Sequence, residues 1–234
     1  MSDIPAAFGT AFALVFRLDA ELLGIVALSL RVSLLAVALA SLAALPLGAA
    51  LALARFPGRA AVIALLNAFM GLPPVVVGLA LYVLLSRAGP LGFLGLLFSP
   101  TAMILAQMVL VLPIVAAISR QVIEDLWIEY ADLLRSLCAT LPQAVATLLW
   151  DARFSLVTGV LAGFGRAISE VGAILIVGGN IAYVTRTMTT AIALETSKGN
   201  LALAMGLGII LLGVSLLASL AAQGVQHLAL RRHA

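Results

Sequence analysis

The sequence predicts an all-α polytopic membrane protein with about five transmembrane helices and a cytosolic helix-turn-helix segment. Hydrophobic residues make up 64% of the 234 residues and charged residues only 10%, which leaves too little polar surface to cover a water-soluble globule. The apolar runs do not alternate apolar and polar residues with a period of two, so a β-barrel is disfavoured. No linker or composition shift divides the sequence, so a single integral membrane domain is expected over residues 1–234.

Five apolar runs are long enough to cross a membrane. A helix needs roughly 20 apolar residues to span the hydrocarbon core, where the backbone must satisfy its own hydrogen bonds. The predicted spans cover residues 32–54, 60–86, 99–119, 154–181 and 200–226. Residues 4–16 form a shorter apolar stretch, which is expected to lie at the membrane interface.

Several of these spans contain prolines, which interrupt helical hydrogen bonding. They are Pro46, the pair Pro73 and Pro74, and Pro113. Each is compatible with a kink that neighbouring helices tolerate, or with an unwound segment beside a translocation path. Arg31, at the head of the first span, is expected to be an interfacial anchor whose charged end reaches toward water.

The distribution of basic residues predicts how the chain is oriented. The positive-inside rule places the loops that are richer in arginine in the cytosol. The expected cytosolic group is Arg55, Arg59, Arg120, Arg135, Arg153, Arg231 and Arg232. Arg17, Arg87, Arg186 and Lys198 then lie outside. This arrangement puts the N-terminus outside and the C-terminus in the cytosol of a bacterial or archaeal cell, in its inner membrane where there are two.

The segment 120–153 collects charge in an otherwise apolar sequence and holds five of the ten acidic residues. Apolar residues recur in it at helical spacing beside an acidic face, which predicts an amphipathic helix. A second helix is expected to open at Pro142, with Thr140 in capping position before it. The result is either a surface connection between spans or a docking knob that seats in a partner protein.

The run from residue 132 to residue 140 resembles the cytosolic coupling motif of binding-protein-dependent ABC importer permeases. In that motif an acidic residue precedes a glycine by six positions. Here Asp132 stands where the family usually has glutamate, Cys138 where it has glycine, and Trp150-Asp151 where it has Leu-Pro. The resemblance implies that ATPase subunits contact Glu129, Asp132, Leu133, Leu134, Arg135, Leu137, Cys138, Ala139 and Thr140.

The block from residue 153 to residue 200 resembles molybdate and tungstate permeases, and its run 189–199 is most similar to the tungstate type. The resemblance implies an importer subunit that pairs with a second copy of itself and receives tungstate from an extracytoplasmic binding protein. Molybdate, or another oxyanion such as sulfate, is the alternative substrate. A secondary transporter or channel without an ATPase partner is the alternative of a different class.

Charge inside the fourth span is the second candidate functional feature. Arg166 and Glu170 are four residues apart and therefore lie on one face of a helix, where an unpaired charge is costly. They are expected to form a structural ion pair or to line an anion pathway. The following segment is expected to be a solvated loop or the landing surface for the binding protein, through Asn180, Thr185, Arg186, Thr187, Glu195 and Lys198.

Other chemistry finds little support in the sequence. The chain has no Gly-x-x-x-x-Gly-Lys-Ser/Thr run, so ATP hydrolysis is expected in a separate subunit and the chain itself is not expected to be an enzyme. Its single cysteine excludes an intrachain disulfide, and its two histidines lie near the C-terminus without further ligands, so no metal or other cofactor is expected. The modest net charge of +3 gives no indication of nucleic-acid binding.

Overall fold

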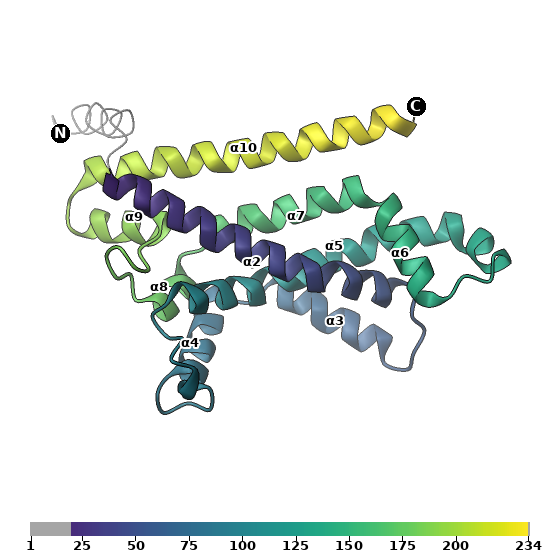
Figure 1. Cartoon of the computed structure of the whole chain (residues 1–234), viewed down its shortest axis with the longest axis horizontal. Coiled ribbons are helices and arrows are strands. Elements are labelled where there is room, and N and C mark those ends of the chain that lie inside the picture. The colour runs from purple at the N-terminus through teal and green to yellow at the C-terminus, as the bar shows by residue number, and fades with distance from the viewer. Residues whose placement is uncertain (1–19, 234) are drawn as a thin grey trace. The chain divides into compact units, whose positions relative to one another are not determined.

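The computed structural model describes the backbone of residues 20–233 and the side chains of residues 20–225. Every regular element in this range is a helix, which confirms the predicted all-α fold (Figure 1). The helices are α2 (Ala20–Leu53), α3 (Arg59–Met70), α4 (Pro74–Leu85), the 3₁₀ helix η1 (Gly92–Leu94), α5 (Pro100–Ser136), α6 (Leu141–Asp151), α7 (Arg153–Ile168), α8 (Gly172–Gly178), α9 (Met188–Ser197) and α10 (Leu201–His233). The predicted interfacial stretch 4–16 lies outside the described residues.

Three of the described helices are long and apolar enough to cross a membrane, namely α2, α5 and α10. The number rises to five if the bent pairs α3–α4 and α6–α7 each count as one span. The predicted spans 32–54, 99–119 and 200–226 coincide with parts of α2, α5 and α10. The other two predicted spans differ from the structure, because α3 and α4 divide residues 60–86, and α7 and α8 divide residues 154–181.

The proline pair explains the first of these breaks. Pro74 occupies the first position of α4, where its missing N–H costs nothing because that group would have no helical partner. Before it, α3 ends at Met70 and the N–H of Gly71 bonds to the carbonyl of Ala68. The other two candidate breakers, Pro46 and Pro113, lie inside the continuous helices α2 and α5.

Helix α5 is much longer than the predicted third span. It has 37 residues, so it extends over about 55 Å, whereas the hydrocarbon core of a bilayer is about 30 Å thick. The predicted span and the predicted amphipathic helix are therefore one continuous element. Its C-terminal part carries four of the five acidic residues of segment 120–153, and the fifth, Asp151, ends α6.

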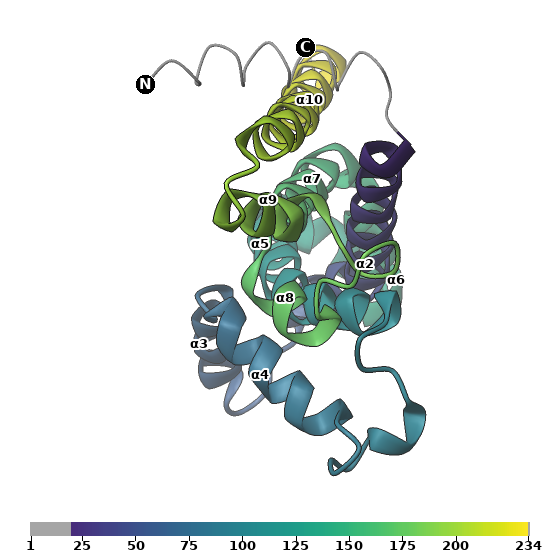
Figure 2. The same ribbon diagram turned by 90° about the vertical axis from the view of Figure 1, so that its left-hand side faces the viewer.

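The chain divides into two compact units. Unit 1 comprises residues 20–36, 73–107 and 166–217. Within it, α4 packs against α8 (Figure 2). A Cβ atom added to Gly78 of α4 would lie 2.8 Å from the Cα atom of Ala173 in α8. Small residues at this crossing therefore let the two backbones approach closely, as is common between membrane helices.

Unit 2 comprises residues 37–72, 108–165 and 218–233. Its buried apolar cluster joins four helices and contains Ala49, Ala52, Leu53, Ile123, Leu134, Ala144, Leu148, Ala152 and Leu156. Close contact between α2 and α5 supports this cluster. The Ser119 hydroxyl donates a hydrogen bond to the Leu45 carbonyl at 2.8 Å, and a Cβ atom added to Gly48 would lie 2.3 Å from the Ala116 carbonyl oxygen.

Gly48→Ala should lower the melting temperature of the purified protein in detergent. The added methyl group meets rigid backbone of α5, so the helices must separate, and such overpacking costs about 1–3 kcal/mol. The control is Gly213→Ala in α10, since no described atom lies within 4 Å of a Cβ atom there. Alanine is the better helix former, so this control should leave the melting temperature unchanged or raise it. Equal effects of the two variants would contradict the close approach at Gly48.

Candidate functional site

The end of α5 is a turn with a defined hydrogen-bond pattern. The N–H of Ala139 donates to the carbonyl of Leu134 at 3.0 Å, and the N–H of Cys138 donates to the carbonyl of Arg135 at 3.0 Å. This pair of bonds is the Schellman motif, which ends helices with one residue in the left-handed conformation. Cys138 is that residue, with φ of +51°.

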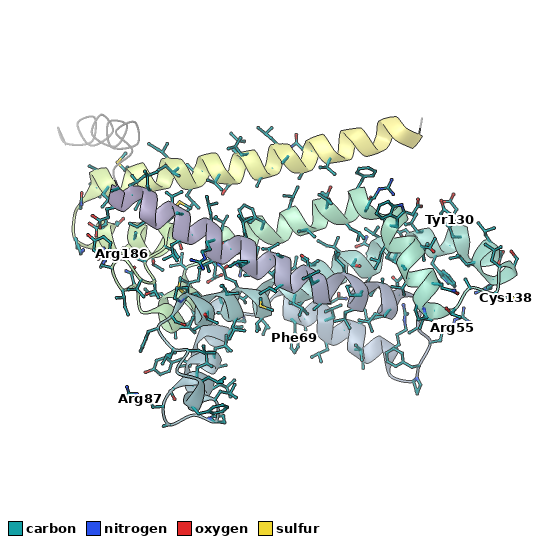
Figure 3. The ribbon with its side chains drawn as sticks, viewed as in Figure 1. Arg55, Phe69, Arg87, Tyr130, Cys138 and Arg186 are labelled. Atoms are coloured by element: carbon teal, nitrogen blue, oxygen red, sulfur yellow. The ribbon has the colours of Figure 1, made fainter. Side chains whose placement is uncertain are left out.

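Cys138 therefore adopts the left-handed conformation that is easiest for glycine, the residue that the coupling motif it resembles has at this position. The sequence made the turn geometry uncertain at this position, because a side chain disfavours positive φ. The structure keeps the turn despite the cysteine. The exposed thiol lies at the outer end of the connection between α5 and α6 (Figure 3).

The start of α6 confirms the second helix predicted for this segment. The helix begins at Leu141, one residue before Pro142, with Thr140 in capping position. The N–H of Thr140 donates to Oε1 of Gln143 at 2.8 Å, which is the backward half of a capping box. Two helix ends thus meet within four residues, and each end has its own hydrogen-bonded cap.

The two helices form a knob with a buried inner face and an exposed outer face. On the inner face, Leu134 of α5 packs with Ala144 and Leu148 of α6 in the apolar cluster of unit 2. The outer face carries the apolar side chains Leu133, Leu137, Leu141 and Trp150. Its acidic residues include Glu129 and Asp132, and the Asp132 side chain is 99% exposed. Of the nine predicted coupling residues, only Leu134 is buried.

A group of charged residues beside this knob was missed by the sequence prediction. Arg59 of α3 caps the C-terminus of α2, with Nε donating to the Leu51 carbonyl at 2.8 Å and Nη2 to the Ala52 carbonyl at 3.3 Å. It also pairs with Glu124 of α5, which in turn pairs with Arg120. The four-residue spacing of Arg120 and Glu124 could have predicted their pairing. The contact of Arg59 with Glu124 could not be predicted in this way, because 65 residues separate them.

The second candidate site lies in unit 1, where α7 ends and α8 begins. Nη1 of Arg166 donates to Oε2 of Glu170 at 2.8 Å, so the predicted pairing is present. The Glu170 side chain is 3% exposed and that of Arg166 is 35% exposed. Oε1 of Glu170 also accepts a hydrogen bond from the N–H of Ala173 at 3.2 Å. The carboxylate therefore caps the first turn of α8, a role hidden from the sequence because one continuous helix was expected.

Side chains from two other helices satisfy the backbone at this break. Nε2 of Gln107 in α5 donates to the Ala167 carbonyl at 2.9 Å, and the Thr189 hydroxyl in α9 donates to the Glu170 carbonyl at 2.7 Å. Unpaired carbonyl groups are costly in lipid, where no water replaces the lost helical bonds. Side chains of Gln107, Glu170 and Thr189 therefore stabilise the break by hydrogen bonds to its backbone.

The segment after α8 contains helix α9, whereas a loop was expected over residues 180–200. Thr185 and Thr187 are buried, and the Thr185 hydroxyl donates to the Gly178 carbonyl at 2.6 Å. The amide of Asn180 donates to the Thr190 carbonyl at 3.3 Å. These three predicted docking residues are thus engaged inside unit 1.

The charged residues of this segment form two pairs. Nη1 of Arg186 lies 3.7 Å from a Glu21 carboxylate oxygen. Lys198 is half-exposed and donates to Oε1 of the buried Glu195 at 2.9 Å. This bond holds the pKa of the Glu195 carboxyl below its ordinary value. The aromatic side chain of Tyr183, in the same segment, is also exposed.

Comparison with known proteins shows the family to which the chain belongs. No family model matches the chain. A probable anion ABC transporter permease protein of Haloferax volcanii is 42% identical over 200 residues, which are 83% of this chain and 86% of that protein. The tungstate uptake system permease protein TupB of Peptoclostridium acidaminophilum is 37% identical over 92% of this chain and 94% of that protein. The sulfate transport system permease protein CysT of Salmonella typhimurium is 30% identical over 70% of this chain and 61% of that protein. The chain therefore belongs to the family of ABC transporter permease proteins.

Proposed function

We propose that this chain is the membrane subunit of an ATP-driven importer for tungstate. Two copies form the translocation pathway, two copies of a separate ATPase bind on the cytosolic side, and an extracytoplasmic binding protein delivers the anion. The chain has no phosphate-binding loop of its own, so the energy for transport must come from another subunit.

The knob formed by the end of α5 and by α6 is the observation that carries this proposal. It combines a rigid base with an outer face of exposed leucine, tryptophan and acidic residues. Apolar side chains held at a polar surface are typical of an interface that another protein covers. A channel or secondary transporter needs no such feature, because it has no ATPase to engage.

The choice of tungstate rests on similarity, since the relative named as a tungstate permease aligns with 92% of this chain. The sulfate permease aligns with 70% at lower identity, which makes sulfate the weaker alternative. Molybdate has the same charge and tetrahedral shape as tungstate and remains the nearest rival. All three are divalent oxyanions, so each would favour a pathway with positive potential.

The break between α7 and α8 is proposed to lie along this pathway. Arg166 supplies positive charge there, and Glu170 holds both the guanidinium and the start of α8 in place. Discontinuous helices with polar side chains are a common way to build an ion path in a membrane. The exposed part of segment 180–200, including Tyr183 and Lys198, is proposed to face the binding protein on the outer side.

Asp132→Lys should abolish co-purification of the ATPase with the permease from detergent-solubilised membranes. Reversing a fully exposed charge leaves folding almost unchanged, but it places like charges together if the ATPase presents a basic surface to the knob. The permease itself should be recovered in normal amounts.

The matched control is Cys138→Gly, which keeps the left-handed turn and removes the strain of a side chain at positive φ. This variant should retain the ATPase. An ATPase that stays bound to the Asp132→Lys protein would contradict the proposed coupling role. If no ATPase accompanies even the unmodified chain, the rival class of secondary transporter or channel gains support.

Glu170→Gln should reduce uptake of the anion while the protein still accumulates in the membrane. Glutamine keeps an acceptor for the Ala173 N–H but removes the charge opposite Arg166, whose guanidinium is partly exposed and can be solvated. Uptake and membrane abundance should be measured in the same cells, with Arg166→Lys as the charge-conserving comparison. Loss of the protein from the membrane would instead assign the pair a purely structural role.

A further inference from the structure

Ile128 has the most exposed large aliphatic side chain among the residues whose side chains are described. It lies on α5 and is 84% exposed. Asp125 and Asp132, three residues before Ile128 and four after it, lie on the same helix face, and Glu129 shares a face with these two aspartates; all three acidic residues are exposed. Residues three, four and seven positions apart share one face of a helix. Ile128 is therefore an exposed apolar residue at the edge of an acidic stripe formed by Asp125, Glu129 and Asp132.

Lipid does not account for this exposure. Helix α5 begins at Pro100, so a span of roughly 20 residues ends near Arg120, and Ile128 lies about 12 Å farther along the helix. No ion pair joins Asp125 or Glu129 to a cation within the described residues. The anionic surface of a membrane repels such unneutralised carboxylates. The stripe is suited to a protein partner with a basic surface.

A groove borders this stripe in unit 2. Its volume is about 440 Å³, and its walls include Arg55, Arg59, Trp127 and Ile128. Arg55 lies in the connection between α2 and α3, in the same unit as Tyr130 and Cys138 (Figure 3). The Arg59–Glu124 pair joins the two walls. The groove is therefore lined by both apolar and charged side chains, and this ion pair links its walls.

The stripe and the knob form one continuous surface. Along α5 the exposed residues run from Asp125 and Ile128 to Glu129 and Asp132, which already belong to the outer face of the knob. Beyond Asp132 follow the exposed Leu133 and Leu137. A partner that binds the knob thus meets Ile128 and the groove without a gap in the contact surface.

We propose that Ile128 and this groove are a second contact site for the same cytosolic ATPase that binds the knob. This inference rests on the proposed function. The ATPase inserts an apolar side chain beside Ile128 and places basic residues opposite Asp125 and Glu129. Contacts at both the knob and the groove would transmit tilting of α5 to α2 through Arg59, which pairs with Glu124 of α5 and caps α2; a single contact at the turn would not do so.

Site-specific photo-crosslinking in intact cells tests the proposal on the full-length chain. Ile128 is replaced by p-benzoylphenylalanine, and cross-linked products are identified by mass spectrometry. Leu137 on the knob is the positive position. Phe93 in η1 is the matched control, because it is 82% exposed and apolar and is separated from Ile128 by the predicted span 99–119.

The expected result is a cross-link from positions 128 and 137 to one protein that contains a phosphate-binding loop, and none from position 93. In a second outcome, position 137 captures the ATPase, but position 128 cross-links only to lipid or to a second copy of this chain, or gives no product. This outcome would overturn the second contact and leave the proposed function intact. If position 137 captures no ATPase either, the proposed function itself fails.

A substitution gives an independent readout. Ile128→Arg should reduce ATPase retention on the purified permease about tenfold, since an interface anchor is replaced by a charge. Ile128→Val should retain it, because a similar apolar side chain remains. Full retention by the Ile128→Arg protein would contradict the inference.

Discussion

The absence of water inside a bilayer is the constraint on which the rest of this structure depends. A broken helix in lipid must find a hydrogen-bond partner for each backbone group that the break releases. At the break between α7 and α8 such partners include the side chains of Gln107, Thr189 and Glu170, which come from different parts of the chain. This arrangement makes a polar, charged site inside unit 1 compatible with its apolar surroundings.

The backbone groups at the ends of α2 and α5 and at the start of α6 also have hydrogen-bond partners. Arg59 covers the last carbonyls of α2, the Schellman bonds close α5, and Gln143 reaches back to the start of α6. Each cap also fixes the position of a functional surface. The knob's two helix ends are closed and its inner face is packed against α2 and α7, so in the proposed function it can pass on movement of a bound ATPase.

Local signals in the sequence predicted a good part of this arrangement. Apolar length predicted the long helices α2, α5 and α10. Thr140 and Pro142 predicted the start of α6 to within one residue, and the four-residue spacing predicted the contact between Arg166 and Glu170. What could not be predicted depends on contacts between distant residues. Nothing near Gln107 shows that its amide will cap a carbonyl 60 residues away.

Two local features were also misleading. Cys138 was a poor candidate for a left-handed turn, yet the Schellman bonds and the burial of Leu134 hold it there. The threonines of residues 185–190 suggested a solvated loop, but their hydroxyl groups turn inward and bond to the ends of α8 and α9. In both cases tertiary packing decided between conformations that the residue type alone left open.

The identity of the transported anion is tested most directly by measuring metal accumulation. Cells that lack this chain, and the same cells with the chain restored, are supplied with tungstate and molybdate at equal trace concentrations, and their tungsten and molybdenum contents are measured by elemental mass spectrometry. Selective loss of tungsten without the chain, and its recovery on restoration, is the predicted result. Loss of molybdenum alone would reassign the substrate, and unchanged contents of both elements would contradict the proposed function.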